Sequence, residues 1–465
     1  MSINEVVCDT VRYFISTFAV LALLAAVASA DLIASDLINE LHDGSNLTHS
    51  DLQGANLSRS HLNRSDLSYS NLQGADLSLS QMIGADLTSI IAKGADFSSA
   101  KMNRIRLYGS DLSHANLCGA DLRGSNIMNA NLSGADLSNA ILQESRMSGA
   151  NLTGANLRGV IMNNVNLTGA DLTDADMSRA SLAGSRMMGA TLTGANLANA
   201  DLTGADMDSA DLEQADLSGS LLFSANLMNA RLRGALLDGA NLIASRLSGA
   251  DLRKCKMSYS QLSRAEIYRA DLSVSDLSGS DFTRAYMMMS NLSGTKLDRA
   301  DLAYADLTEA NLSSASLKGA VIPNLDLTRT DLSGADLTGV SLMFTEMIGT
   351  DLHGAIMKRA TISRVAMRDT NLSRADLRDA IISVSLMENV NLSGADLRDA
   401  SMDIVLISDT DMRGANLEGI KCDQFTMPYL AASPLDGATI DKALDLRLNS
   451  SKEYHQKLEM SLGRE

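Results

Sequence analysis

Cysteine and histidine are too few and too scattered in this chain to build a disulfide framework or a metal centre. The 465 residues contain four cysteines and six histidines, and the cysteines lie far apart. A disulfide-stabilised fold or a zinc site needs such residues at short, regular spacings. No serine lies in a nucleophile-elbow motif, so the sequence also lacks that hydrolase signature. We therefore expect no catalytic residues, no metal site and no cofactor.

An excess of positive charge is also missing. The chain has 39 Lys+Arg against 56 Asp+Glu, which gives a formal net charge of −17. Direct binding to nucleic acid or to an anionic membrane surface needs the opposite balance. The charge still permits a protein that imitates nucleic acid.

A large apolar residue recurs instead at every fifth position. Residues 131–140 read NLSGADLSNA, which is two such units side by side. Every fifth residue from Leu47 to Leu417 is Leu, Ile, Met or Phe, with Ala92 as the single exception. The residue two positions earlier is usually Ala or Ser, and the residue directly before is most often Asp or Asn. This spacing matches neither a helix nor an alternating strand. It predicts one side of a coil, with the large and the small residue pointing inward.

A second period of 20 residues divides the large inward residues into four columns. One column is leucine without exception from Leu112 to Leu392, whereas another is rich in methionine, including Met147, Met187 and Met207. We name the four sides after their inward residues: side A (Leu112, Leu132, Leu152), side B (Leu117, Leu137, Leu157), side C (Leu122, Leu142, Met162) and side D (Leu107, Ile127, Met147). The segregation predicts a four-sided coil of 20 residues.

Units such as Ala150-Asn151-Leu152-Thr153-Gly154 resemble the pentapeptide repeat family. The resemblance implies an all-β solenoid, a right-handed quadrilateral β-helix. About 19 coils, each rising ~4.8 Å, would form a rod roughly 90 Å long. Members of that family include DNA-mimicking, topoisomerase-binding proteins that confer quinolone resistance. The resemblance thus implies one possible function, DNA mimicry, which requires a high density of negative charge.

The N-terminal segment 1–44 contains an uncharged apolar run, YFISTFAVLALLAAVASA, at residues 13–30. Three interpretations remain open: a membrane anchor, a cleaved signal peptide ending at Ala28-Ser29-Ala30, and a helical cap on the solenoid. Ile33, Leu37 and Leu41 continue a helical spacing past the cleavage site, which favours an anchor or a cap. We expect a protein that is membrane-associated or exported rather than cytoplasmic.

The repeat domain is predicted to span 45–427, followed by a C-terminal cap or tail at 428–465. Met427-Pro428 and Ser433-Pro434 break the five-residue frame. Residues 435–440 resemble one last, frame-shifted unit, and 441–461 indicate a short cap, either helical or irregular. A cap is expected because bare ends of a solenoid expose unpaired strand edges.

Outward apolar residues gather on sides C and D, whereas sides A and B keep a regular Asp/Asn-Ser/Thr-Gly pattern. The resulting candidate interaction surface comprises Tyr108, Met128, Ile141, Ile161, Met188, Leu221, Phe223, Met228, Ile243, Tyr268, Met288, Met343, Phe344 and Ile348. Arg106, Arg146, Arg186 and Arg246 are interleaved with them. Segregation by column predicts a larger apolar patch than a monomer ordinarily exposes.

The sequence therefore predicts a non-enzymatic structural or interaction rod. We expect it to bind a protein partner or to self-associate through sides C and D, with membrane contact through residues 13–30 and no direct binding of nucleic acid. The alternative is a DNA-mimicking topoisomerase-binding protein. Duplex DNA of ~90 Å carries about 50 negative charges at one per ~1.7 Å, far more than this chain offers.

Overall fold

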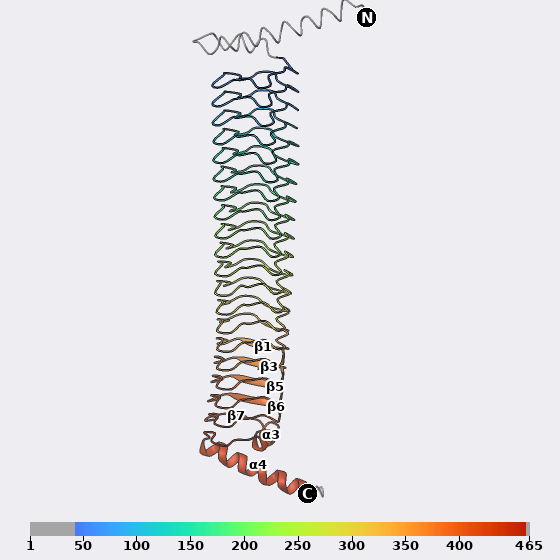
Figure 1. Cartoon of the computed structure of the whole chain (residues 1–465). Coiled ribbons are helices and arrows are strands. Elements are labelled where there is room, and N and C mark those ends of the chain that lie inside the picture. Colours follow the sequence, from blue (N-terminus) through green and yellow to red (C-terminus); the bar gives the residue numbers. More distant parts are fainter. Residues whose placement is uncertain (1–41, 462–465) are drawn as a thin grey trace, which may run out of the picture. The chain divides into compact units, whose positions relative to one another are not determined.

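The computed structural model of the protein describes residues 42–461, with side chains as far as Lys452. The chain divides into two compact units, Met1–Asn226 and Leu227–Glu465. In each unit, coils of backbone are stacked one on the next (Figure 1). The predicted N-terminal helix, with the run 13–30, lies outside the described residues. Within 42–461, none of the helices has the length and apolar character needed to cross a membrane.

Each five-residue unit is a short bridge followed by a β-turn. In the unit 131–135, Asn131 forms a parallel bridge with Asn151 of the next coil. The N–H of Leu132 donates to the carbonyl of Asn151 at 2.7 Å, and the N–H of Ala135 closes the turn on the carbonyl of Leu132 at 3.0 Å. Gly134 has a φ of +63°, as the third residue of a type II turn requires. The turn makes the corner that a five-residue spacing needs.

The bridges repeat every 20 residues, so four units complete one coil. In the compact unit Met1–Asn226 the bridged pairs run from Asn46 with Asp66 to Asp206 with Asn226. In the second unit they run from Arg231 with Asp251 to Asp396 with Asn416. The predicted β-solenoid is confirmed. The figure of about 19 continuous coils stays a prediction, because the two units are described separately.

The core of each unit consists of the large and small inward residues. Leu132 and Ala135, for example, are almost completely buried, and Phe97 and Phe282 are the largest side chains that are fully enclosed. Burying a leucine-sized side chain contributes about 1.5–3 kcal/mol, so each five-residue repeat adds a similar amount of stabilising free energy. The solenoid is therefore stabilised evenly along its coils rather than by one central core.

Ala92, the exception in the large inward column, is compensated by its neighbour. Ile90 occupies the small inward position two residues earlier, and both side chains are buried. The Ile90 N–H does not close the usual turn; it donates to Ser110 Oγ of the next coil at 3.3 Å. Ser110 Oγ in turn donates to the carbonyl of Leu87 at 2.7 Å. Large and small residues have exchanged places at about constant volume.

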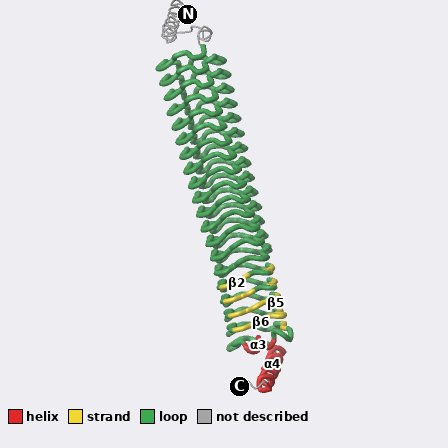
Figure 2. The backbone as a smooth tube through the Cα atoms, turned by 90° about the vertical axis from the view of Figure 1, so that its right-hand side faces the viewer, coloured by secondary structure: helices red, strands yellow, loops and turns green. Residues whose placement is uncertain are grey.

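Extended strands appear only towards the C-terminal end of the described solenoid (Figure 2). They are β1 (Ser341–Met343), β2 (Glu346–Ile348), β3 (Thr361–Ser363), β4 (Ala366–Arg368), β5 (Ile381–Glu388), β6 (Ser401–Ser408) and β7 (Lys421–Cys422). All pair in parallel, in the order β1-β3-β5-β4-β2, with β6 between β5 and β7. Here a hydroxyl of the next coil replaces the turn bond: Val365 N–H donates to Ser385 Oγ at 3.2 Å.

Two helices follow the last coil, α3 (Met427–Ala432) and α4 (Lys442–Ser461). Within 442–452, the part of α4 whose side chains are described, the buried residues are Leu444 and Leu448. At the start of the helix, Asp441 Oδ1 accepts the N–H of Leu444 at 2.7 Å. Between the helices, Thr439 bridges Asn416 at a separation of 23 residues instead of 20. This is the frame-shifted unit expected from the sequence.

Candidate interaction surface

The exposed large apolar residues of the solenoid lie mainly on sides C and D. In the unit Met1–Asn226 they are Ile83, Ile161, Leu221 and Phe223 on side C and Tyr69, Tyr108 and Met188 on side D. In the unit Leu227–Glu465 they are Tyr304, Val321, Met343, Phe344, Ile381, Val384 and Ile404 on side C and Tyr268, Tyr286, Met289 and Leu406 on side D. Sides A and B contribute only Ile91, Val274, Leu79 and Tyr259 within the described residues.

The structure separates the predicted surface residues into two groups. Those that are exposed are Tyr108, Ile161, Met188, Leu221, Phe223, Tyr268, Met343 and Phe344. Those that are only half-buried are Met128, Ile141, Met228, Ile243, Met288 and Ile348. Coils stack ~4.8 Å apart, so the residue 20 positions away covers the flank of each side chain. The second group can therefore contribute less contact area to a partner.

Several exposed residues of the same sides were not among the predicted ones. They are Tyr69, Ile83, Tyr286, Met289, Tyr304, Val321, Ile381, Val384, Ile404 and Leu406. Each occupies an outward position of the five-residue frame, so the frame alone was sufficient to find them. Most of them lie in the compact unit Leu227–Glu465, so this unit exposes more apolar side chains on sides C and D than predicted from the sequence.

The third turn position is left-handed on all four sides, and on side C it carries exposed apolar groups in several coils. Phe344, Val384 and Ile404 occupy the third turn position, with φ of +57°, +51° and +58°. They are 49%, 50% and 54% exposed. A left-handed conformation costs a residue other than glycine roughly 1–2 kcal/mol, and β-branched residues adopt it rarely. Neither burial nor turn geometry accounts for bulky apolar side chains here.

Arg364 belongs to the same column as these residues. Its guanidinium carbon lies 5.1 Å from the centre of the Phe344 ring, which is a cation–π contact. We call Phe344, Arg364, Val384 and Ile404 the side C strip. The strip combines three apolar side chains with one cation on adjacent coils.

Sides A and B are regular and polar. On side B, Arg378 donates through Nε and Nη2 to the two carboxylate oxygens of Asp376, each at 2.8 Å. Arg398 forms the same pair with Asp396, and Arg378 Nε lies 3.6 Å from Asp396 Oδ2 in the next coil. The hydrogen bonds from Arg378 and Arg398 lower the pKa of Asp376 and Asp396 respectively. These ladders of ion pairs connect neighbouring coils of the second compact unit and neutralise part of its acidic charge.

The titratable groups of the described residues form no arrangement typical of catalysis. Residues 42–452 contain no group of three His, Cys, Asp or Glu that could hold a metal ion. Burial raises the pKa of the Cys255 thiol to about 12 and that of Cys422 to about 11. Both thiols are therefore protonated at neutral pH and serve as apolar core residues.

The repeat geometry agrees with a comparison of the sequence with known families. The family model described as Pentapeptide repeats matches more than half of the chain, at residues 43–78, 105–143, 145–184, 185–222, 225–258, 245–284, 290–324, 324–364 and 385–419. The chain belongs to the pentapeptide repeat family. Among curated proteins, no relative matches its sequence.

Several solved pentapeptide repeat structures are similar to this protein. HetL, a protein involved in heterocyst differentiation regulation in the cyanobacterium Nostoc sp. strain PCC 7120, is 32% identical over 50% of this chain and 91% of its own, with a TM-score of 0.28. A protein of the Arabidopsis thaliana thylakoid lumen is 36% identical over 21% of this chain and 69% of its own, with a TM-score of 0.21. QnrB1, a plasmid-mediated fluoroquinolone resistance protein, is 16% identical over 56% of this chain and 95% of its own, with a TM-score of 0.17. At these TM-scores the function of none of them carries over.

Proposed function

We propose that this pentapeptide repeat protein is a non-enzymatic scaffold that self-associates through the apolar residues of sides C and D. The observation that carries the proposal is the side C strip, where exposed apolar side chains are retained on strained backbone. The left-handed turn serves the fold, but a bulky apolar residue there costs more than glycine or aspartate would, and such a cost is typical of functional positions. A second copy is the simplest partner, because an apolar strip can meet its own equivalent across a two-fold axis.

The test replaces the strip by residues that the backbone tolerates well. Aspartate is common in the left-handed conformation, and Asp369, Asp379 and Asp399 occupy equivalent turn positions. The triple variant Phe344→Asp, Val384→Asp, Ile404→Asp should therefore fold, and it should lose self-association in sedimentation velocity experiments. Val274→Asp, at the same turn position on side A, is the matched control and should behave like the wild type. A monomeric wild-type protein, or an oligomer that the triple variant leaves intact, would contradict the proposal.

The apolar run 13–30 supports a second part of the proposal, that the scaffold is tethered at a membrane or exported. This part depends on the sequence alone. Fractionation of the native protein, combined with identification of its first residue, separates the three interpretations. A full-length protein that stays entirely in the soluble cytoplasmic fraction would contradict both tethering and export.

The alternative, a DNA-mimicking topoisomerase inhibitor, has weaker support. A net charge of −17 over the whole chain is far from the density of duplex DNA, and the ladders of side B neutralise part of it. A gyrase supercoiling assay with the purified protein decides the matter. Inhibition at micromolar protein would favour the alternative over self-association as the primary function.

A further inference from the structure

The last coil of the solenoid, residues 401–420, is covered on three of its four sides by the chain that follows it. In the coil before, Leu392 and Gly394 donate their N–H groups forward to the carbonyls of Asp411 and Arg413, at 2.7 and 2.9 Å. In the last coil the equivalent donors of sides A, B and C are also engaged. On side C, β6 pairs with β7 and the N–H of Ile404 donates to Asp423 Oδ2. On side A, the N–H groups of Met412 and Gly414 donate to the carbonyls of Pro434 and Asp436. On side B, the N–H of Leu417 donates to the carbonyl of Thr439, and that of Gly419 donates to Asp441 Oδ2.

Side D of the last coil is different. No described residue accepts a hydrogen bond from the N–H of Ile407 or of Asp409. By the register of the preceding coil, where Asn389 N donates to the Ser408 carbonyl, the acceptors would be the carbonyls of Thr426 and Pro428. The chain enters α3 at this point, and the Thr426 carbonyl accepts the N–H groups of Tyr429 and Leu430 instead, both at 3.1 Å. The helix has taken the acceptors that would have closed the edge.

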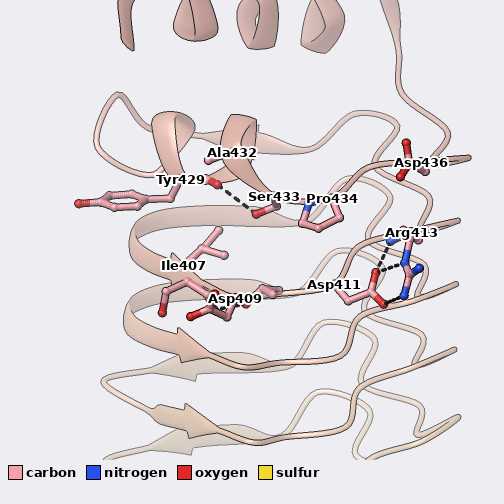
Figure 3. Close-up of a pocket in the computed structure, with 11 residues that line it drawn as sticks. Ile407, Asp409, Asp411, Arg413, Tyr429, Ala432, Ser433, Pro434 and Asp436 are labelled. Atoms are coloured by element: carbon pink, nitrogen blue, oxygen red, sulfur yellow. Dashed lines mark hydrogen bonds and ion pairs between the residues drawn. The ribbon is translucent and has the colours of Figure 1, made fainter. Parts of the chain in front are cut away.

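A hollow of about 590 Å³ lies along this open edge. Figure 3 shows it between the backbone of Ile407 to Asp411 and the end of α3, where Tyr429, Ala432 and Ser433 form the opposite wall. Ala432 is exposed, so its methyl group leaves the hollow wide. A volume of this size is within the range of natural binding sites.

We propose that this edge groove binds an extended peptide with basic side chains, which adds as a parallel strand to β6. The two free N–H groups belong to residues two apart on one edge, and alternate carbonyls of an extended strand are spaced to accept both. A helical ligand does not fit the donors, because its carbonyls are already bonded within the helix. The groove is distinct from the side C strip, and it predicts a partner other than a second copy.

The charges of the groove select a basic peptide. Its lining includes Asp409, Asp411, Asp436 and Arg413. Arg413 donates to both carboxylate oxygens of Asp411, at 2.9 and 2.7 Å, which neutralises that group. Asp409 and Asp436 form no ion pair within the described residues, and Arg413, which also interacts with Asp436, is already paired with Asp411. A lysine or arginine of an added strand would provide their counter-charge.

Fluorescence anisotropy with the full-length protein tests the proposal. The probe is a labelled peptide of alternating lysine and valine, and the reference is a peptide of alternating glutamate and valine of equal length. We expect saturable binding of the first and binding of the second weaker by about tenfold or more. Ala432→Trp fills the groove and should abolish binding, whereas Ala198→Trp, at a half-buried outward turn position of side B in the other compact unit, should not. Equal binding of both peptides, or binding that survives Ala432→Trp, would overturn the proposal.

Hydrogen exchange supplies a second, independent readout. In the free protein the amides of Ile407 and Asp409, in the segment 405–410, should exchange faster than those of Met387 and Asn389, in the segment 385–390 one coil earlier, and the basic peptide should slow them. Equal protection of both segments without peptide would show that the edge is already closed and would overturn the proposal. A second outcome would also overturn the proposal: the protein does not bind the peptide, yet it self-associates and Ala432→Trp abolishes that self-association. The groove would then be occupied by a second copy of the chain. The triple variant of the side C strip should bind the peptide normally, so this test and the test of self-association fail separately.

Discussion

At the scale of single residues, one pair of inward positions carries its large and small residues in the reverse order. Ile90 and Ala92 reverse the usual order of small and large residues, and both remain buried. Ser110 supplies the hydroxyl that the opened turn needs, through its bonds to the Ile90 N–H and the Leu87 carbonyl. The exception in the repeat thus depends on residues in two coils.

Exchanging these two residues provides a test at this scale. Ile90→Ala should cost about 2–5 kcal/mol through a cavity, and Ala92→Leu about 1–3 kcal/mol through overpacking. The double variant restores the usual order and should lie within about 1 kcal/mol of the wild type, because neighbouring sites couple. Urea denaturation followed by circular dichroism measures all three. Additive losses in the double variant would show that the two positions do not share one space.

At the scale of elements, side B of the second unit is a ladder of ion pairs that connects successive coils. Lys358 Nζ lies 3.3 Å from Asp376 Oδ2, and Arg378 contacts both Asp376 and Asp396. Single ion pairs on a protein surface stabilise the fold little, but bidentate arginine–carboxylate pairs within a network contribute more. The ladder therefore links the coils in addition to the backbone bonds.

The ladder makes stability depend on pH in a defined direction. The arginine hydrogen bonds lower the pKa of Asp376 and Asp396 in the folded chain. In the unfolded chain the pKa of an aspartate is about 3.9. Their stabilisation is therefore present above about pH 4 and is lost as the pH falls through the lowered folded-state values.

We expect Asp396→Asn to be less stable than the wild type at pH 7, and the difference to shrink as the pH falls below about 4. Urea midpoints across this range measure it. Asp174→Asn, at an exposed turn position, is the control and should show no such convergence. A wild-type advantage that is constant with pH would contradict the role assigned to the ladder.

At the scale of the whole molecule, stability is local because each coil contacts only its neighbours. The C-terminal cap is part of this scheme. Leu444 and Leu448 of α4 are buried, and Arg447 Nη2 donates to the Cys422 carbonyl at 2.5 Å. α4 thus covers the last turn of backbone without contributing to distant coils.

Removal of α4 should therefore have a graded effect. A chain that ends after Asp441 keeps the acceptor for the Gly419 N–H but exposes the backbone around Cys422. We expect faster hydrogen exchange in the coils nearest the cap, unchanged exchange in the unit Met1–Asn226, and a greater tendency to aggregate. Leu446→Ala, at an exposed position of the same helix, should leave exchange unchanged. Loss of protection throughout the chain would show global cooperativity instead.

The sequence alone was sufficient to predict the coil. Because every unit is the same length and buries one large and one small residue, the frame from Leu47 to Leu417 identifies the inward residues and the 20-residue register. The frame also assigns each outward residue to a side, so it distinguishes sides C and D from sides A and B without knowledge of the tertiary structure.

Only the tertiary structure decided how much of each outward residue is accessible and which edge stays open. Met128 and Met188 occupy equivalent positions, yet one is half-buried and the other exposed, because the cover comes from residues 20 positions away. The open edge at Ile407 and Asp409 depends on where α3 begins and on which N–H groups the Thr426 carbonyl accepts. Both are properties of contacts between distant residues, and a local repeat does not encode them.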